Sequence, residues 1–174
     1  MIVQRALDRV GVPWRNGRGV QYEIAADGPL PEGWTWRVST ADIDSDVPFS
    51  LYSGVLRDFC VAEGKGVVLT IGDVPHRCML HSVTAFTGDD TVSATLVDGP
   101  VRALNLMRVE GSASFSWHIL RAGESIAVPR VVVALADGAL IRIDGQQIEL
   151  ATLDAVLAVE GRVVEVVRGT AAMC

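Results

Sequence analysis

The sequence predicts an all-β protein built from two barrel-like halves. Short runs rich in Val, Ile and Leu recur along the chain, and Gly-containing turns separate them. Asp-Gly and similar pairs supply the positive φ that tight hairpins need. No long segment shows the apolar period of an amphipathic helix. Strands of about five residues at short spacing are typical of a sandwich or barrel.

The positions of the glycine-containing turns predict the individual strands. Arg5–Val10 fits either one turn of helix or a strand. The clearest predicted strands are Val67–Ile71, Val101–Val109, Arg130–Leu135, Ala139–Ile143, Gln147–Leu150 and Val163–Val167. Predicted turns centre on Gly64, Gly72, Gly88, Gly99, Gly138, Gly145 and the pair Glu160-Gly161.

A weak internal repeat relates the two halves. Gly64 precedes Gly138 by 74 residues, and Gly88 precedes Gly161 by 73 residues, with similar strands between them. Matched offsets favour two copies of one β unit over a coincidence of glycine spacing. We therefore expect an N-terminal half at residues 1–110 and a C-terminal half at residues 111–174, packed in one compact unit. Strand exchange between the halves stays open.

Composition narrows the classes of function. The chain has 174 residues, 49% of them hydrophobic, and a net charge of 15 − 21 = −6. Its acidic residues are scattered and no basic stripe exists, so nucleic-acid binding is not expected. No apolar run is long enough for a membrane span, and the N-terminus lacks the layout of a signal peptide. A cytoplasmic location is the default expectation.

The residues that bind metals or cofactors are sparse. The cysteines are few, widely spaced and without a C-x-x-C pair, so reduced and buried thiols are expected at Cys60, Cys78 and Cys174. His76 and His81 would point to opposite faces of a strand, and His118 beside Trp117 is expected to be structural. We expect no metal and no other cofactor, because phosphate-loop and dinucleotide fingerprints are also absent. No nucleophile elbow supports a hydrolase.

Five motifs in the first half carry a family resemblance. In order, they are Pro13-Trp14-Arg15-Asn16-Gly17, Trp36-Arg37-Val38-Ser39, Pro48-Phe49-Ser50 with Gly54-Val55-Leu56-Arg57, Phe86-Thr87-Gly88-Asp89, and Gly99-Pro100-Val101 with Asn105 and Met107. Together they resemble the HutD/Ves family. The second half fits by length and by its Gly123-Glu124, Val128-Pro129 and Gly138 spacing, which resembles that of cupin barrels. Arg18, Gln21 and Leu56 depart from the family pattern.

The resemblance implies a bicupin fold, with two β-barrel or jelly-roll-like halves. It also implies a cytosolic accessory role, which in many relatives is associated with histidine utilisation. The family has no firmly established enzymatic activity, so small-molecule binding or regulation is the usual inference.

Arg57 is the first candidate for a ligand-binding residue. It opens the predicted strand Asp58–Ala62, which should line the first barrel. An arginine inside a barrel is costly unless it meets an anion, and its planar fork suits a carboxylate. A structural salt bridge, for instance to Asp58, explains it equally well.

Arg37 and Ser39 share one face of their predicted strand, and Trp36 and Val38 share the other. In the commoner pattern, Trp36 and Val38 face the core and Arg37 meets solvent. In the alternative, Arg37 and Ser39 line a pocket.

The remaining candidates are more ambiguous. Asn105 lies in an apolar run and needs partners, either in a loop or in a ligand, with the loop slightly favoured. Trp14 and Asn16 belong to a turn that could form the lip of a pocket. Glu23 could pair with Arg15 or Arg37, and Phe86 is expected in the core.

Three functions remain open. The preferred one is a non-catalytic or regulatory protein that binds a small anionic metabolite through a carboxylate, linked to histidine breakdown. The alternative is a metal-independent isomerase or lyase, for which Glu23 and His81 are the only acid–base candidates. The third is an interaction protein with a filled barrel. Homodimer formation also stays open.

Overall fold

The structure, a computed structural model, describes residues 1–112, 114–159 and 161–174. The first residue of the turn predicted at Glu160-Gly161 therefore lies outside the described residues. The regular secondary structure of the described residues consists of antiparallel β-strands and one 3-10 helix, η1 (Ala6–Asp8), which falls within the ambiguous segment Arg5–Val10. The predicted all-β class is confirmed.

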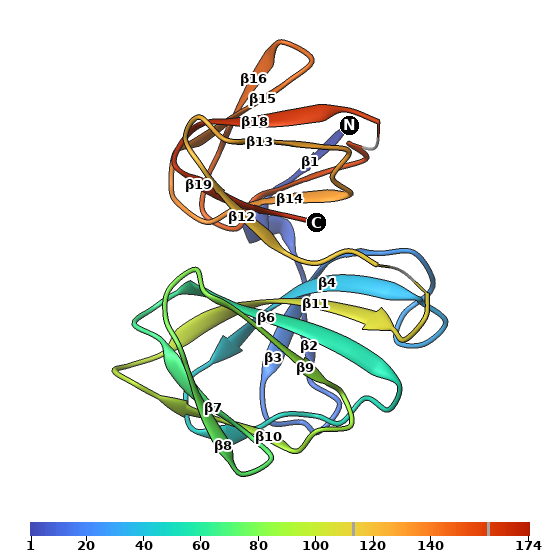
Figure 1. Cartoon of the computed structure of the whole chain (residues 1–174), viewed down its shortest axis with the longest axis vertical. Helices are drawn as coiled ribbons and strands as arrows, with labels where there is room; N and C mark the ends of the chain where they lie inside the picture. The colour runs from blue at the N-terminus through green and yellow to red at the C-terminus, as the bar shows by residue number, and fades with distance from the viewer. Residues whose placement is uncertain (113, 160) are drawn as a thin grey trace. The chain divides into compact units, whose positions relative to one another are not determined.

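The chain divides into two compact units. The N-terminal unit is Val10–Ser114, and the C-terminal unit is Phe115–Cys174 together with Met1–Arg9. The first nine residues thus belong to the unit formed by the end of the chain. In Figure 1 the N-terminal strand β1 (Ile2–Gln4), in blue, accompanies the orange and red strands, and it pairs with β17 (Ala155–Leu157).

The N-terminal unit contains a six-stranded and a four-stranded sheet. The larger sheet has the order β2 (Gly11–Pro13), β3 (Val20–Ala26), β4 (Trp36–Ile43), β11 (Val101–Val109), β6 (Val55–Glu63) and β9 (Val83–Thr87). The smaller has the order β5 (Val47–Pro48), β10 (Val92–Leu96), β7 (Val67–Ile71) and β8 (Val74–Cys78). One apolar cluster draws residues from both sheets, including Phe59 from β6 and Leu69 from β7.

The C-terminal unit has a five-stranded and a four-stranded sheet. The first has the order β1, β17, β14 (Val131–Ala134), β19 (Thr170–Met173) and β12 (His118–Arg121). The second has the order β13 (Ser125–Ala127), β18 (Val163–Arg168), β15 (Ala139–Ile143) and β16 (Gln146–Leu150). Its core is aliphatic and includes Ile141, Leu150 and Met173.

The two units repeat one pattern of strand pairing. In the N-terminal unit β6 pairs with β9 and β11, and β7 pairs with β8 and β10. In the C-terminal unit β14 pairs with β17 and β19, and β15 pairs with β16 and β18. Gly64 and Gly138 occupy equivalent turns, each with a positive φ, between the first and second strands of the repeat. The predicted repeat therefore reflects two copies of one β unit.

The position of strand β11 in the larger sheet explains why its sequence is almost continuously apolar. It lies between β4 and β6, and its residues from Ala103 to Arg108 are buried on both faces. A strand covered on both sides reads as a nearly continuous apolar run rather than an alternating one. The few polar residues in such a run are therefore buried, and each needs a partner.

Asp154 holds the N-terminal arm, Met1–Arg9, against the rest of its unit. Its carboxylate accepts hydrogen bonds from Arg5 Nη1 at 2.6 Å, from the Ala6 amide at 2.8 Å and from the Ala151 amide at 3.1 Å. Burial alone would raise the pKa of this carboxyl. The hydrogen bonds from Ala6, Arg5 and Ala151 and the charge of Arg5 outweigh that effect and leave the pKa below its usual range.

Asp154→Ala is expected to loosen the arm at neutral pH. Losing the carboxylate that accepts from two backbone amides and pairs with the half-exposed Arg5 should lower the free energy of local opening by about 2 kcal/mol. Because the folded-state pKa is depressed, the charge-dependent part of the effect should be complete above the unfolded-state value of about 3.9 and be lost as the pH falls through the lower folded-state pKa. Hydrogen exchange of the β1 amides measures it, with Asp8→Ala, an exposed acid of the same arm, as control. Equal exchange in both variants would contradict the assignment.

Candidate functional site

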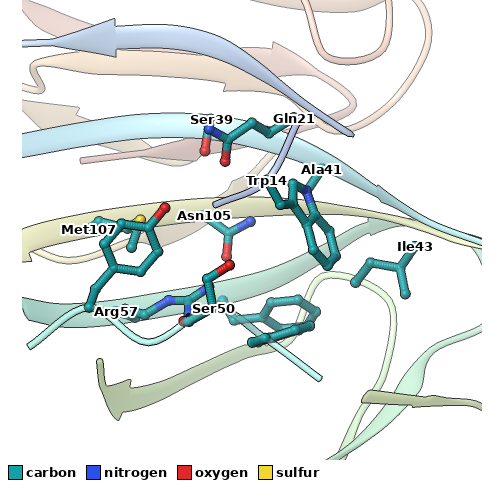
Figure 2. Close-up of a pocket in the computed structure, with 12 residues that line it drawn as sticks. Trp14, Gln21, Ser39, Ala41, Ile43, Ser50, Arg57, Asn105 and Met107 are labelled. Atoms are coloured by element: carbon teal, nitrogen blue, oxygen red, sulfur yellow. Dashed lines mark hydrogen bonds between the residues drawn. The ribbon is translucent and has the colours of Figure 1, made fainter. Parts of the chain in front are cut away.

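A small cavity lies inside the N-terminal unit. Its volume is about 30 Å³, room for roughly two water molecules. We call it the inner cavity, and it is lined by Trp14, Gln21, Ser39, Ala41, Ile43, Phe49, Ser50, Tyr52, Arg57, Phe59, Asn105 and Met107. Figure 2 shows the side chains of Arg57, Ser50 and Asn105 converging at this cavity.

Three adjacent strands present the polar lining because of their register. Asn105 of β11 lies opposite Ser39 of β4 on one side and Phe59 of β6 on the other. Met107 lies opposite Arg57. Since side chains two residues apart share a face, Arg57 and Phe59 enter the same cavity as Asn105 and Met107.

The Arg57 guanidinium is enclosed by aromatic rings. Its Cζ lies 4.9 Å from the ring centroid of Phe86, 5.3 Å from that of Phe49 and 5.8 Å from that of Tyr52. The residue is 8% exposed. Burial lowers its pKa to about 10; Tyr52 opposes this effect and the nearby Arg37 adds to it. The side chain therefore remains charged at neutral pH.

Arg57 has no carboxylate partner among the described residues. Its Nη1 donates to the Ser50 carbonyl at 3.2 Å, and its buried Nε has no hydrogen-bond partner. Asp58, the proposed structural partner, instead accepts from Arg108 Nη2 at 2.8 Å. The salt-bridge explanation for Arg57 thus fails, because Asp58 lies on the opposite face of the strand. A buried cation with unused donors is suited to an anion.

Asn105 and Ser39 complete the polar side of the inner cavity. They are 7% and 2% exposed. Asn105 Oδ1 is buried and has no hydrogen-bond partner in the described part of the chain. Its side chain lies mid-strand in the cavity lining, so both roles considered for Asn105, holding a loop or contacting a ligand, stay predictions.

A second, larger cavity adjoins the first. We call it the outer chamber; its volume is about 400 Å³. It shares Gln21 and Tyr52 with the inner cavity and is also lined by Pro13, Arg15, Pro31, Glu32, Gly33, Trp34, Arg37, Ser53, Val55 and Val109.

Arg37 lines the outer chamber and does not face solvent. It is 3% exposed, because β4 lies between β3 and β11 and is buried on both faces. The commoner pattern considered for this strand is therefore wrong. Arg37 Nη2 donates to Glu23 Oε2 at 2.6 Å, which selects one of the two pairings considered for Glu23. Burial raises the pKa of the Glu23 carboxyl, and Arg37 partly offsets that effect.

Trp14 and Asn16 have different positions. Trp14 lines the inner cavity and meets Phe49 edge-on, with ring centroids 6.0 Å apart. Asn16 is exposed and organises its turn: its Nδ2 donates to the Pro48 carbonyl at 3.0 Å, and its Oδ1 accepts from the Arg18 amide at 3.1 Å. Asn16 lines neither cavity. Phe86 is buried, as expected.

Several lining residues were not singled out from sequence. They are Gln21, Ala41, Ile43, Phe49, Ser50, Tyr52, Phe59 and Met107. Phe49, Ser50 and Met107 lie within the family-like motifs, which was the available signal. Tyr52 lies between two motif fragments in a loop, and no periodic pattern marks it.

The sequence model of the HutD family matches residues 6–174. The chain belongs to the HutD family. Among curated relatives, it is 38% identical over 105 residues to an uncharacterised 21.2 kDa protein in the hutC 3′ region of Pseudomonas putida, an alignment covering 59% of this chain and 55% of that protein. It is also 38% identical over 96 residues to protein Ves of Citrobacter koseri, covering 54% and 50%. The chain thus spans about half the length of these curated relatives.

Solved structures agree with the HutD assignment. HutD from Pseudomonas fluorescens SBW25, in a formate condition, has a TM-score of 0.81 at 31% identity, covering 99% of this chain and 95% of that one. The conserved protein PA5104 of Pseudomonas aeruginosa PAO1 has a TM-score of 0.84 at 30% identity, with the same coverage. A salicylate 1,2-dioxygenase from Pseudoaminobacter salicylatoxidans, 11% identical with a TM-score of 0.60, covers 99% of this chain and 85% of its own, which shows the cupin fold alone. The predicted bicupin fold is confirmed.

The described residues of this HutD-family chain do not gather metal-binding side chains in one place. No three His, Cys, Asp or Glu side chains among the described residues form a cluster that could hold a metal ion. His76 lies in β8, His81 follows that strand with a φ of 62°, and neither lines the inner cavity or outer chamber. The opposite-face argument for this pair therefore does not apply. His118, expected to be structural, is exposed at the start of β12.

The cysteines and the membrane-spanning potential of the chain were also considered from the sequence. Cys60, Cys78 and Cys174 are buried reduced thiols, as predicted, and burial raises the pKa of Cys60 to about 12. Across the part of the chain that is described, no helix has the length and apolar character needed to cross a membrane.

Proposed function

We propose that this chain is a non-catalytic or regulatory protein that binds a small carboxylated metabolite in the inner cavity. The observation that carries the proposal is Arg57: a charged guanidinium, 8% exposed, with an unused Nε donor and no carboxylate partner among the described residues. A ligand carboxylate would replace the missing partner, and the planar fork of arginine suits its two oxygens.

The lining favours binding over catalysis. None of the described residues that line the inner cavity is Asp, Glu or His. An isomerase or lyase would need a proton donor and acceptor within reach of the ligand. Glu23 is engaged by Arg37, and His81 lies outside both cavities, so the two acid–base candidates do not meet at Arg57.

A link to histidine utilisation is part of this proposal. It is supported by membership of the HutD family and by the P. putida relative, whose name places it in the hutC 3′ region. Binding of a carboxylated metabolite would let an accessory protein sense the level of a degradation product. The proposed setting is the cytoplasm.

Matched pairs of acids and amides test the proposal. Formate and acetate should bind measurably by calorimetric titration, and formamide and acetamide at least tenfold more weakly, because only the acids supply an anion to Arg57. The small volume of the inner cavity makes these probes suitable. Equal binding of acids and amides, or no binding of either, would count against carboxylate recognition.

A further inference from the structure

The two cavities of the N-terminal unit differ in how their charges are balanced. In the inner cavity, the charge of Arg57 has no carboxylate beside it among the described residues. In the outer chamber, the charge of Arg37 is already matched by Glu23, at 2.6 Å. The other charged lining residues described there, Arg15 and Glu32, are exposed and opposite in sign. A ligand spanning both cavities thus meets one net positive charge, at the inner end.

The volumes require such a ligand to extend into the outer chamber. The inner cavity, at about 30 Å³, accommodates little more than a carboxylate. The outer chamber has about 400 Å³ and shares the lining residues Gln21 and Tyr52 with the inner cavity. A metabolite larger than acetate therefore needs space outside the inner cavity, and the outer chamber is a neighbouring cavity that shares lining residues with it.

The outer chamber offers hydrogen bonding without net charge. Arg37 Nε is buried and has no partner among the described residues, although its Nη2 is engaged by Glu23. Trp34 is fixed by its own hydrogen bond, from Nε1 to the Pro31 carbonyl at 3.0 Å, and its ring lies 5.6 Å from the Arg37 guanidinium carbon. A planar group with a hydrogen-bond acceptor fits this rigid wall. A second carboxylate would gain less there than at Arg57, because Glu23, which itself lines neither cavity, already neutralises Arg37 at 2.6 Å.

We propose that the outer chamber is a second subsite that selects a neutral, planar, hydrogen-bond-accepting group, such as an amide. The ligand is then a monoanion with one carboxylate at Arg57 and an uncharged polar end near Arg37. This inference rests on the proposed function and specifies its ligand class. In this proposal the ion pair of Arg37 and Glu23 determines specificity, because its balanced charge favours an uncharged group over a second carboxylate.

Three probes of similar size test the subsite by calorimetric titration at constant ionic strength. Succinamate carries one carboxylate and one amide, succinate carries two carboxylates, and butyrate carries one carboxylate and an apolar end. Succinamate should bind roughly tenfold more tightly than succinate and several-fold more tightly than butyrate. Succinate binding as tightly as succinamate would overturn the subsite.

The variant Glu23→Gln supplies a charge control. Glutamine keeps a carbonyl for Arg37 but removes the negative charge, so Arg37 becomes a second uncompensated cation. The preference for succinamate over succinate should fall at least fivefold, and an unchanged preference would overturn the role of Glu23. If butyrate binds in an Arg57-dependent manner while succinamate and succinate bind with equal affinity, the second subsite is wrong and the proposed function stands. If none of the three binds through Arg57, both fail.

Discussion

Arg57→Ala is expected to weaken binding of a small carboxylate by about 30-fold or more. Truncating a desolvated arginine that contacts a carboxylate typically costs about 2–5 kcal/mol. Arg57 is 8% exposed and enclosed by Phe49, Tyr52 and Phe86, so water can replace little of the lost interaction. Isothermal titration with acetate measures the effect. Arg57→Lys should recover only part of the affinity, because a point charge does not reproduce the planar fork.

Arg77→Ala is the matched control, because Arg77 is exposed in the same unit and lines neither cavity. It should change acetate affinity little. Since the pKa of Arg57 is about 10, affinity should stay constant between pH 6 and 8 and decline as the pH rises through that value. Unchanged acetate affinity in Arg57→Ala, together with a sharply lower unfolding midpoint, would make Arg57 a structural residue.

The fold was largely predictable because its local signals agree. Val67–Ile71, Val101–Val109 and Ala139–Ile143 are strands with the predicted bounds, and glycines with positive φ mark the turns between them. Such short strands and turns depend mainly on local chemistry. The membership of Met1–Arg9 in the C-terminal unit depends instead on long-range pairing, for which the sequence carries no local mark.

The site was only partly predictable. Four of the candidate residues chosen from the sequence line the inner cavity: Trp14, Ser39, Arg57 and Asn105. Alternation along β6 places Asp58 on the face opposite to Arg57, but the partner of Asp58 is Arg108 from strand β11, and the sequence does not mark the pairing of β11 with β6. Asn16 was misleading, since a turn asparagine bonds its own loop as readily as a ligand.

The loop that carries Tyr52 is the least predictable part of the site, and Gly88 fixes its position. The Tyr52 amide donates to the Gly88 carbonyl at 2.8 Å, and the Gly88 amide donates to the Val55 carbonyl at 2.6 Å. A Cβ added at Gly88 would lie 2.0 Å from the Tyr52 carbonyl oxygen. This close approach of two backbones explains why glycine is needed in the segment Phe86-Thr87-Gly88-Asp89.

Gly88→Ala is therefore expected to move the Tyr52 loop and to disrupt both cavities. A methyl group that meets backbone cannot be relieved by a rotamer change, so the loop must shift, at a cost of about 1–3 kcal/mol in stability. Because Tyr52 lines both cavities and its ring lies 5.8 Å from Arg57, acetate affinity should fall about tenfold or more. Titration and urea unfolding of the same preparation measure the two effects.

Gly72→Ala is the control that separates loop displacement from the general cost of replacing glycine. Gly72 has a positive φ of 58°, and a Cβ added there meets nothing within 4 Å. Its substitution should cost about 1 kcal/mol through backbone strain alone. Since Gly72 lies in the turn between β7 and β8 and lines neither cavity, acetate affinity should be retained. If Gly88→Ala also retains acetate affinity while losing stability, Tyr52 does not shape the site, and the inner cavity must be formed without its loop.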